Sequence, residues 1–189
     1  IANMPPLVDC GGHYVDVMCQ MTRAKPVLVQ GMAARVAEDI PADQNNYGAL
    51  QVVFDDKSVG WYEVGWGPMM SKVAFFVKDV IGPKGCVSID KDIAGVDPSD
   101  VSKHTTVDTI ILHSSAMDAQ GRQAAKDQAI HIDDEPDHDE LCKREQAFLY
   151  DAIVNDTDLG DHMDDAVNSL KICFAAVDSY KTGKAIRLR

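Results

Sequence analysis

Two carboxylates and an imidazole lie close together near the start of the chain, at Asp9, His13 and Asp16. An α-helix advances about 100° per residue, so these side chains and Gln20 would share one narrow face. A carboxylate four residues before an imidazole can hold one ring nitrogen and leave the other free as a base. Removing a proton from a hydroxyl group needs such a base. The spacing predicts that His13 is a general base assisted by Asp9; the alternative is a solvated polar face with an incidental pair.

Gly11 and Gly12 lie within the same predicted helix. Each glycine inside a helix costs about 1 kcal/mol relative to alanine. Glycine is favoured where another backbone or a ligand must come close. An idle polar face has no such need, so the two glycines favour a functional face and are candidates for contact with a cofactor.

The elements that must position these residues begin with a helix from about Leu7 to Thr22. Strand patterns follow at short intervals, with a hairpin turn at Asp55 to Ser58 and another turn at Gly82 to Gly85. The expected buried stripe of the helix lies away from its acidic face and comprises Tyr14, Val17, Met18 and Met21. The expected strands are 27–36, 49–55, 59–66, 73–81, 86–90, 109–113 and 128–133.

Two further helices, 137–155 and 161–182, precede an alternating last segment, 184–189, that is typical of an edge strand. Gly183 stands where a left-handed residue commonly ends a helix. Strands joined by short turns pair mainly antiparallel. The expected fold is therefore α+β with two layers, a large, mostly antiparallel open sheet with helices on one face. The second helix carries an apolar stripe of Met163, Val167, Leu170, Phe174 and Val177.

Both faces of the expected sheet carry apolar residues, because alternate side chains of a strand point in opposite directions. Helices can cover only one of these faces. We expect the other face to be buried against a second subunit, which predicts a homo-oligomer joined through the sheet.

The composition is that of a single globular domain over residues 1–189, with 46% hydrophobic and 25% charged residues. The formal net charge of −12 argues against binding to nucleic acid or to an anionic membrane surface. No apolar run approaches the roughly 18 residues that span a bilayer. The five cysteines are odd in number and irregular in spacing, which favours reduced thiols in a cytoplasmic protein. The chain starts at Ile1 without a signal peptide or Met, as expected of a processed or shortened product.

Three segments resemble the glucose–fructose oxidoreductase / inositol dehydrogenase / MocA-like family. Residues 9–16 (DCGGHYVD) are similar to its D-x-G-x-H-x-[IV]-D helix. Residues 82–87 (GPKGCV) resemble its G-x-x-G turn between two strands. Residues 165–188 resemble its closing helix, which ends in S-x-x-[ST]-G-x-x-[IV]-x-L. The resemblance covers nearly the whole chain, and the three motifs occur in the family's order.

The resemblance implies the fold of the family's C-terminal domain, which is like that of dihydrodipicolinate reductase, and a part in an NAD- or NADP-dependent oxidation. By this resemblance, His13 takes the proton of a sugar or polyol hydroxyl while hydride leaves for the nicotinamide. Asp9 would orient His13 or bind a neighbouring hydroxyl, and Asp16 would support the structure or the substrate. The family forms dimers or tetramers through its sheets.

The sequence also departs from the family. It has no G-x-G-x-x-G strand–turn–helix fingerprint. It lacks the E-K-P segment that brings the family's catalytic lysine. We therefore expect the Rossmann domain to be missing from this chain, and the chain alone to have no dehydrogenase activity and to bind NAD weakly or not at all. The alternative function is a non-catalytic α+β module for assembly or binding.

Two groups of possible metal ligands have simpler interpretations. The acidic run 131–140 offers hard ligands for a divalent cation, but Pro136 and early carboxylates are also typical of a helix start, which we favour. Cys10 and His13 form a C-x-x-H pair with no second ligand pair at zinc spacing. No metal is therefore expected.

Aromatic residues and the remaining histidines complete the list of candidates. Trp66 stands between two glycines, Gly65 and Gly67, which leave its indole accessible for contact with a sugar. Trp61 and Tyr62 are more typical of sheet packing or of an interface. The pattern gives no partner for His104, His113 or His162.

Overall fold

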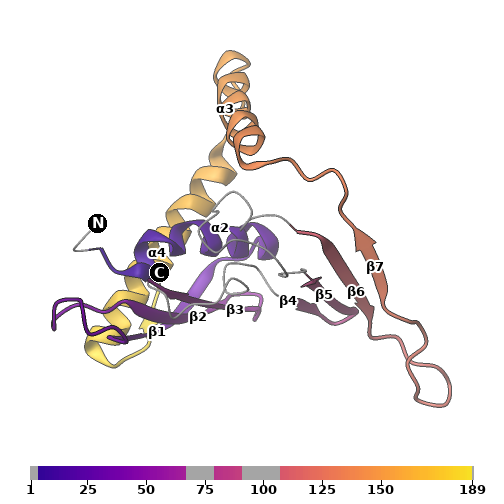
Figure 1. The fold of residues 1–189 in the computed structure, drawn as a ribbon, viewed down its shortest axis with the longest axis horizontal. Helices are drawn as coiled ribbons and strands as arrows, with labels where there is room; N and C mark the ends of the chain where they lie inside the picture. The colour runs from indigo at the N-terminus through magenta and orange to yellow at the C-terminus, as the bar shows by residue number, and fades with distance from the viewer. Residues whose placement is uncertain (1–3, 67–78, 91–106, 189) are drawn as a thin grey trace. The chain divides into compact units, whose positions relative to one another are not determined.

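The structure, a computed structural model, describes residues 4–66, 79–90 and 107–188. The chain divides into two units. The first combines Ile1–Met70 with Asp158–Arg189, and the second is Ser71–Thr157. Figure 1 labels the helices and strands of both units, apart from α1 and β8.

The first unit is built on a four-stranded sheet in the order β3-β2-β1-β8. All its neighbouring strands are antiparallel, and Gln30 on β1 is opposite Gln51 on β2, which is opposite Trp61 on β3. The side chains alternate between a buried and a more exposed face along β1 to β3. The strands are β1 (Pro26–Ala34), β2 (Tyr47–Phe54), β3 (Val59–Gly65) and β8 (Ile186–Arg187).

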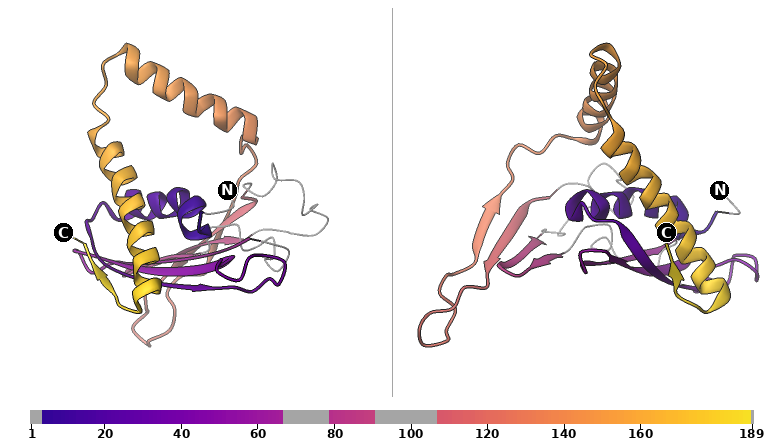
Figure 2. Two further views of the ribbon diagram at one scale, coloured as in Figure 1. Left: turned by 90° about the vertical axis from the view of Figure 1, so that its left-hand side faces the viewer. Right: turned by 180° about the vertical axis from the view of Figure 1, so that it is seen from behind.

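Three helices cover the buried face of this sheet: α1 (Pro6–Asp9), α2 (Gly11–Thr22) and α4 (Gly160–Thr182). Both views in Figure 2 show α4 running beside α2 and against the strands. The core between helices and sheet includes Leu7, Val15, Val29, Leu50, Val52, Phe54 and Ile172. α1 is buried in this core at its first residues, Pro6 and Leu7, and the turn to α2 follows at Cys10.

The helices bury stripes that differ in part from those expected, although Tyr14 and Met18 of the predicted α2 stripe do pack against the core as partly buried residues. On α2 the buried residues are Gly11, Val15 and Cys19, while the predicted core residue Met21 is 55% exposed. On α4 only Val177 of the predicted stripe is buried. The other four residues of that stripe are exposed: Met163, Val167, Leu170 and Phe174. The physical reason on α4 is close packing, because the helix meets the sheet through small residues such as Cys173 and Ala176.

The second unit contains a four-stranded antiparallel sheet in the order β4-β5-β6-β7. A row of Val80, Val87 and Leu112 shares one face, and Cys86 and His113 are opposite each other on the other face. Its elements are β4 (Asp79–Gly82), β5 (Gly85–Asp90), β6 (Thr109–Ser114), β7 (Gln128–His131) and helix α3 (His138–Val154).

The predicted α+β class with antiparallel strands is confirmed, with the described strands distributed over two four-stranded sheets. Gly183 ends α4 at a φ of 67°, and the hairpin turn before β5 uses Gly85 at a φ of 152°, as the motifs predicted. The expected helix 7–22 is divided at Cys10 into α1 and α2. Residues 73–78 of one predicted strand lie outside the described residues, as does His104. Among the described helices, none has the length and hydropathy of a membrane span.

Candidate active site

Asp9 and His13 lie on either side of the turn between α1 and α2. Asp9 is the last residue of α1, and His13 is the third of α2, where its backbone N–H donates to the Cys10 carbonyl at 3.3 Å. Both side chains are exposed. Within the described part of the chain, no hydrogen bond joins the Asp9 carboxylate to the His13 imidazole. The expected pair depended on one continuous helix, whereas in the structure the turn at Cys10 lies between the two residues.

Trp66 lies beside Cys10, and its position is set by Asn46. The Trp66 backbone N–H donates to the Asn46 carbonyl at 2.7 Å, and the Asn46 Nδ2 donates to the Trp66 carbonyl at 2.9 Å. The Asn46 Oδ1 accepts from the Val36 N–H at 2.9 Å, and Asn46 is only 3% exposed. Asn46 thus clamps the segment after β3, a role that no sequence signal indicated.

The Cys10 thiol connects Trp66 with the Asp9 side of the turn. Burial raises the pKa of Cys10, the indole N–H of Trp66 donates to its sulfur and opposes that rise, and Asp9 adds to it. The Cys10 Sγ is 3.9 Å from the Asp9 Oδ2. The Cys10 side chain therefore lies near two of the predicted site residues, Asp9 and Trp66, and His13 meets Cys10 through its backbone N–H.

The two glycines of α2 have different surroundings. A Cβ on Gly11 would lie 2.9 Å from the Cys173 Sγ and 3.5 Å from the Tyr62 ring, so packing within the unit accounts for this glycine. A Cβ on Gly12 would meet no atom within 4 Å. Only Gly12 leaves space open to an approaching ligand, and the contact of either glycine with a cofactor stays a prediction.

Asp16 lies further along α2 and already has a partner. The Gln20 Nε2 donates to its Oδ2 at 2.7 Å, so the expected sharing of one face by Asp16 and Gln20 is present. Near the end of the same helix, Arg23 forms an ion pair of 3.2 Å with Asp165 of α4. These contacts anchor α2, and a role for Asp16 in binding substrate stays a prediction.

Two stacked tyrosines pack under the start of α2. The rings of Tyr14 and Tyr62 have centroids 5.5 Å apart and planes at 22°. Burial raises the pKa of both phenols, and the nearby Cys10 side chain raises each further. Both hydroxyls therefore stay protonated at neutral pH. The sequence predicted sheet packing or an interface for Tyr62, because a strand pattern does not reveal which helix end a side chain reaches.

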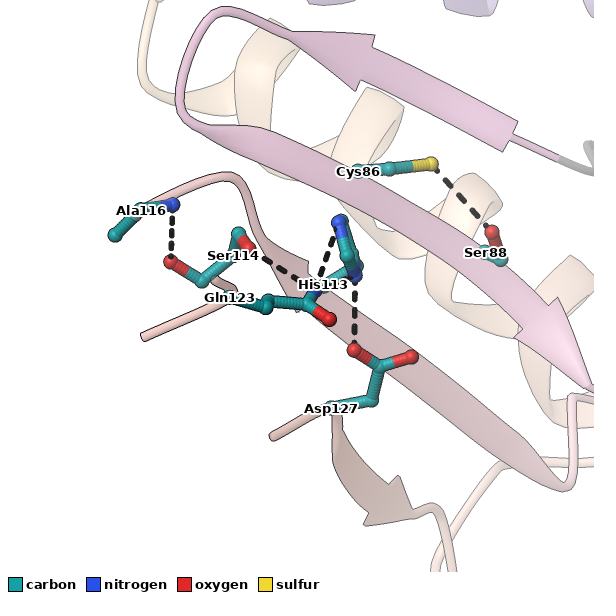
Figure 3. A network of polar contacts seen from close by, with 7 residues as sticks. All are labelled: Cys86, Ser88, His113, Ser114, Ala116, Gln123 and Asp127. Carbon is teal, nitrogen blue, oxygen red and sulfur yellow. Dashed lines mark hydrogen bonds and ion pairs between the residues drawn. The ribbon is translucent and has the colours of Figure 1, made fainter. Parts of the chain in front are cut away.

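A second polar cluster lies on the sheet of the other unit (Figure 3). The His113 Nδ1 is 2.8 Å from the Asp127 Oδ1, and Gln123 Nε2 is 3.0 Å from the same ring nitrogen. The Cys86 Sγ is 3.5 Å from the Ser88 Oγ on the same face. His113, which had no expected partner, thus has two, Asp127 and Gln123. The polar groups of this cluster are exposed and form hydrogen bonds with one another.

The acidic run 131–140 does begin a helix. The Asp137 carboxylate accepts from the Glu140 N–H at 2.9 Å and caps α3. Glu140 itself pairs with Lys143 and Arg144 at 3.2 and 3.0 Å. The predicted helix start is therefore confirmed.

No family model and no curated protein matches the sequence. Solved structures do match the fold at low sequence identity. An aldose–aldose oxidoreductase from Caulobacter crescentus, complexed with glycerol, has a TM-score of 0.62 at 15% identity over 94% of this chain and 46% of its own. The myo-inositol 2-dehydrogenase from Lactobacillus plantarum has a TM-score of 0.59 at 19% identity over 98% of this chain and 49% of its own.

An oxidoreductase from Agrobacterium radiobacter, in complex with NAD⁺, L-tartaric acid and magnesium, has a TM-score of 0.63 at 13% identity. It matches 95% of this chain and 48% of its own. The chain spans about half the length of these solved structures. It has the fold of the C-terminal half of oxidoreductases of the glucose–fructose oxidoreductase / inositol dehydrogenase / MocA type, which is the group that its motifs resemble.

Proposed function

We propose that this chain is the substrate domain of an NAD- or NADP-dependent oxidoreductase that oxidises a CH–OH group of a sugar or polyol. The observation that carries the proposal is the exposed His13 imidazole at the start of α2, four residues after the exposed Asp9. The shared fold supports it, because structures with this fold include an aldose–aldose oxidoreductase and a myo-inositol dehydrogenase.

In the proposed reaction His13 accepts the proton of the substrate hydroxyl. A free ring nitrogen open to solvent can take this proton, and the charge that forms on the imidazole is stabilised by a nearby carboxylate. Asp9 provides that carboxylate across the turn at Cys10 or binds a neighbouring hydroxyl of the substrate. Trp66 offers an apolar ring face to the sugar, and Asp16 supports the far end of the site.

The residues of this chain do not fit the binding of a whole dinucleotide. The sequence has no glycine-rich turn to bind a pyrophosphate, and the space beside Gly11 is occupied by Cys173 and Tyr62. Only the open space over Gly12 could admit the edge of a cofactor. We therefore assign no hydride step to this chain, and we propose that a cofactor domain outside it holds NAD or NADP.

The proposed assembly is a homo-oligomer joined through the exposed face of the β3-β2-β1-β8 sheet. This face has a shallow hollow of about 220 Å³ over the three longer strands. Trp61 and Met32 on its walls are 50% and 54% exposed. Large apolar side chains on an open sheet face are typical of an interface.

The decisive experiment uses the protein in which this chain is joined to a dinucleotide-binding domain. Replacing His13 with Ala should lower kcat by about a hundredfold or more, because the base is lost, while the apparent melting temperature stays unchanged. The matched control is His138→Ala, an exposed histidine at the start of α3. The 189-residue chain alone should form no NADH from myo-inositol or D-glucose.

The opposite result supports the alternative, a non-catalytic assembly module. The exposed apolar sheet face is the feature that favours this alternative, because such a module needs an interface and no base. Equal turnover of His13→Ala and the unaltered protein would leave His13 without a catalytic role. Measurable oxidation of a polyol by the 189-residue chain would contradict the need for a separate cofactor domain.

A further inference from the structure

The phenol of Tyr62 is a buried polar group without a partner. Tyr62 lies on β3, on the face covered by the helices, and is 8% exposed. Within the described residues its hydroxyl forms no hydrogen bond, in contrast to the side chains of the buried Asn46 and Ser179. A buried hydroxyl left unpaired is destabilising, so native structures usually supply it with a partner. The position of this hydroxyl shows what kind of partner fits.

The ring of Tyr62 points its hydroxyl end toward the turn between α1 and α2. Of its ring atoms, Cε1 is closer than Cδ1 to the Cβ position of Gly11, at 3.5 against 4.0 Å. After burial, the neighbouring groups that raise the pKa of the phenol are Cys10 first, with Tyr14, Cys173 and Asp9 after it. Cys10 and Asp9 border the candidate active site. The unpaired hydroxyl therefore lies at the inner side of that site.

Among the residues that the structure describes, the hydroxyl has no better partner. Tyr14 stacks on the Tyr62 ring, which holds the phenol in place but presents a ring face to it. The Cys10 thiol is a weak acceptor, and it already receives the indole N–H of Trp66. A rigidly held donor without an acceptor is preorganised for a ligand that brings one.

We infer that Tyr62 is a substrate-binding residue whose hydroxyl donates a hydrogen bond to a hydroxyl group of a bound sugar or polyol, between Asp9 and Trp66. This inference rests on the proposed function and identifies a contact of the same site. A polyol fits because each of its hydroxyls can accept from Tyr62 and also donate to the Asp9 carboxylate. Burial raises the pKa of Tyr62, so the phenol remains a donor throughout the physiological range.

The test is a titration of the 189-residue chain, labelled with ¹³C at the tyrosine Cζ and at the histidine rings, with myo-inositol, D-glucose and glycerol. Tyr62→Phe assigns the Tyr62 signal and removes only the oxygen. We expect at least one of these compounds to move the Tyr62 and His13 signals together. We expect Tyr62→Phe to weaken its binding about tenfold, which is the usual effect of one hydrogen bond.

Two controls separate binding from packing. Tyr180→Phe removes a hydroxyl from a partly buried tyrosine of the same core, on α4, and should leave the affinity unchanged. The melting temperature of Tyr62→Phe without ligand should be equal to or higher than that of the unaltered chain, since an unpaired hydroxyl is removed. A clearly lower melting temperature would show that an ordered water already satisfies the phenol, and would overturn the inference.

The outcomes also distinguish this inference from the proposed function. If a compound moves the His13 signal but not the Tyr62 signal, and Tyr62→Phe binds it equally well, Tyr62 is a packing residue while the proposed function stands. If no compound moves either signal at saturating concentration, both the inference and the assignment of a polyol site to this chain are wrong.

Discussion

Two thiols are among the most buried titratable side chains in the part of the chain that the structure describes. Cys19 on α2 and Cys173 on α4 belong to the same core. Burial raises the pKa of Cys19 to about 11, with Asp165 and Asp16 adding to the rise. Burial raises the pKa of Cys173 to about 12. A thiolate at either position would be a charge in an apolar layer, so the folded state keeps both protons in alkaline solution.

This makes the stability of the fold sensitive to alkali. The thiols titrate near pH 9 in the unfolded chain and near pH 11 to 12 in the folded one. Above about pH 9 the unfolded chain binds fewer protons than the folded chain, so the free energy of unfolding falls as pH rises through this window. Below about pH 9 these groups contribute no pH dependence. Urea unfolding at a series of pH values from neutral to alkaline measures this slope.

Cysteine variants attribute the slope to its source. Cys173→Ala should flatten the alkaline fall, although its stability at neutral pH is lower because of the lost packing. Cys86→Ala, at a partly exposed position on β5, is the matched control and should keep the slope. A stability that is constant from about pH 8 to 11 in the unaltered chain would contradict the burial of these thiols.

At the level of elements, the contact between α4 and β1 sets how the helix layer lies on the sheet. A Cβ on Gly31 would lie 2.2 Å from the Ala176 carbonyl oxygen, and the Gly31 N–H donates to the Ser179 Oγ at 2.9 Å. Ser179 is 2% exposed. Backbone therefore meets backbone at this point, and only glycine fits on the strand.

Gly31→Ala should lower the free energy of unfolding by about 1–3 kcal/mol, because α4 must move away from β1. The matched control is Gly12→Ala, where the added methyl meets open space and the helix gains up to about 1 kcal/mol. Chemical denaturation of the two variants gives both values. If Gly31→Ala is as stable as the unaltered chain, the close approach of α4 to β1 is wrong.

The same contact explains which parts of the fold the sequence could predict. Strand and helix positions follow from local periodicity and turn residues, so the hairpin at Asp55 to Ser58 and the cap at Gly183 were predicted and are confirmed. The buried side of α4 is set by the small residues that face Gly31, which is far away in the sequence. The sequence pattern instead favoured the side of α4 that carries the larger apolar residues Met163 and Phe174. Periodicity finds an apolar stripe but does not show that small residues are buried instead.

The candidate site shows the same limit. His13, Asp9 and Trp66 were predicted from residue types and spacing, and the structure places Asp9 and Trp66 near the Cys10 side chain, while the roles of all three stay predictions. Asn46 could not be found, because it acts by clamping a segment twenty residues away. Tyr62 could not be recognised as a site residue, because only the packing of β3 under α2 brings its hydroxyl to the turn.

At the level of the whole molecule, the exposed face of the β3-β2-β1-β8 sheet makes a prediction about assembly. Trp61, Met32 and Gln51 line its hollow, and alternation along the strands leaves them no partner on their own sheet face other than one another. A symmetric dimer would place this surface against itself, so each buried contact would occur twice. We expect the chain to dimerise through this face.

Trp61→Glu should therefore convert the dimer to a monomer at micromolar concentration, because two new carboxylates would be buried close to the symmetry axis. The measurement is sedimentation or light scattering over a range of protein concentrations. Each copy has a net charge of −12, so association should strengthen as added salt screens the repulsion.

The control must change an exposed apolar residue that lies away from this face. Met21 on α2 meets that condition, since it is 55% exposed and belongs to the helix layer, and Met21→Glu should leave the dimer intact. If Met21→Glu also dissociates the protein, the interface involves the helices and not the sheet. A monomer of the unaltered chain at all concentrations and salt levels would contradict the sheet-face assembly, and Trp61 would then be left as an exposed indole without a role.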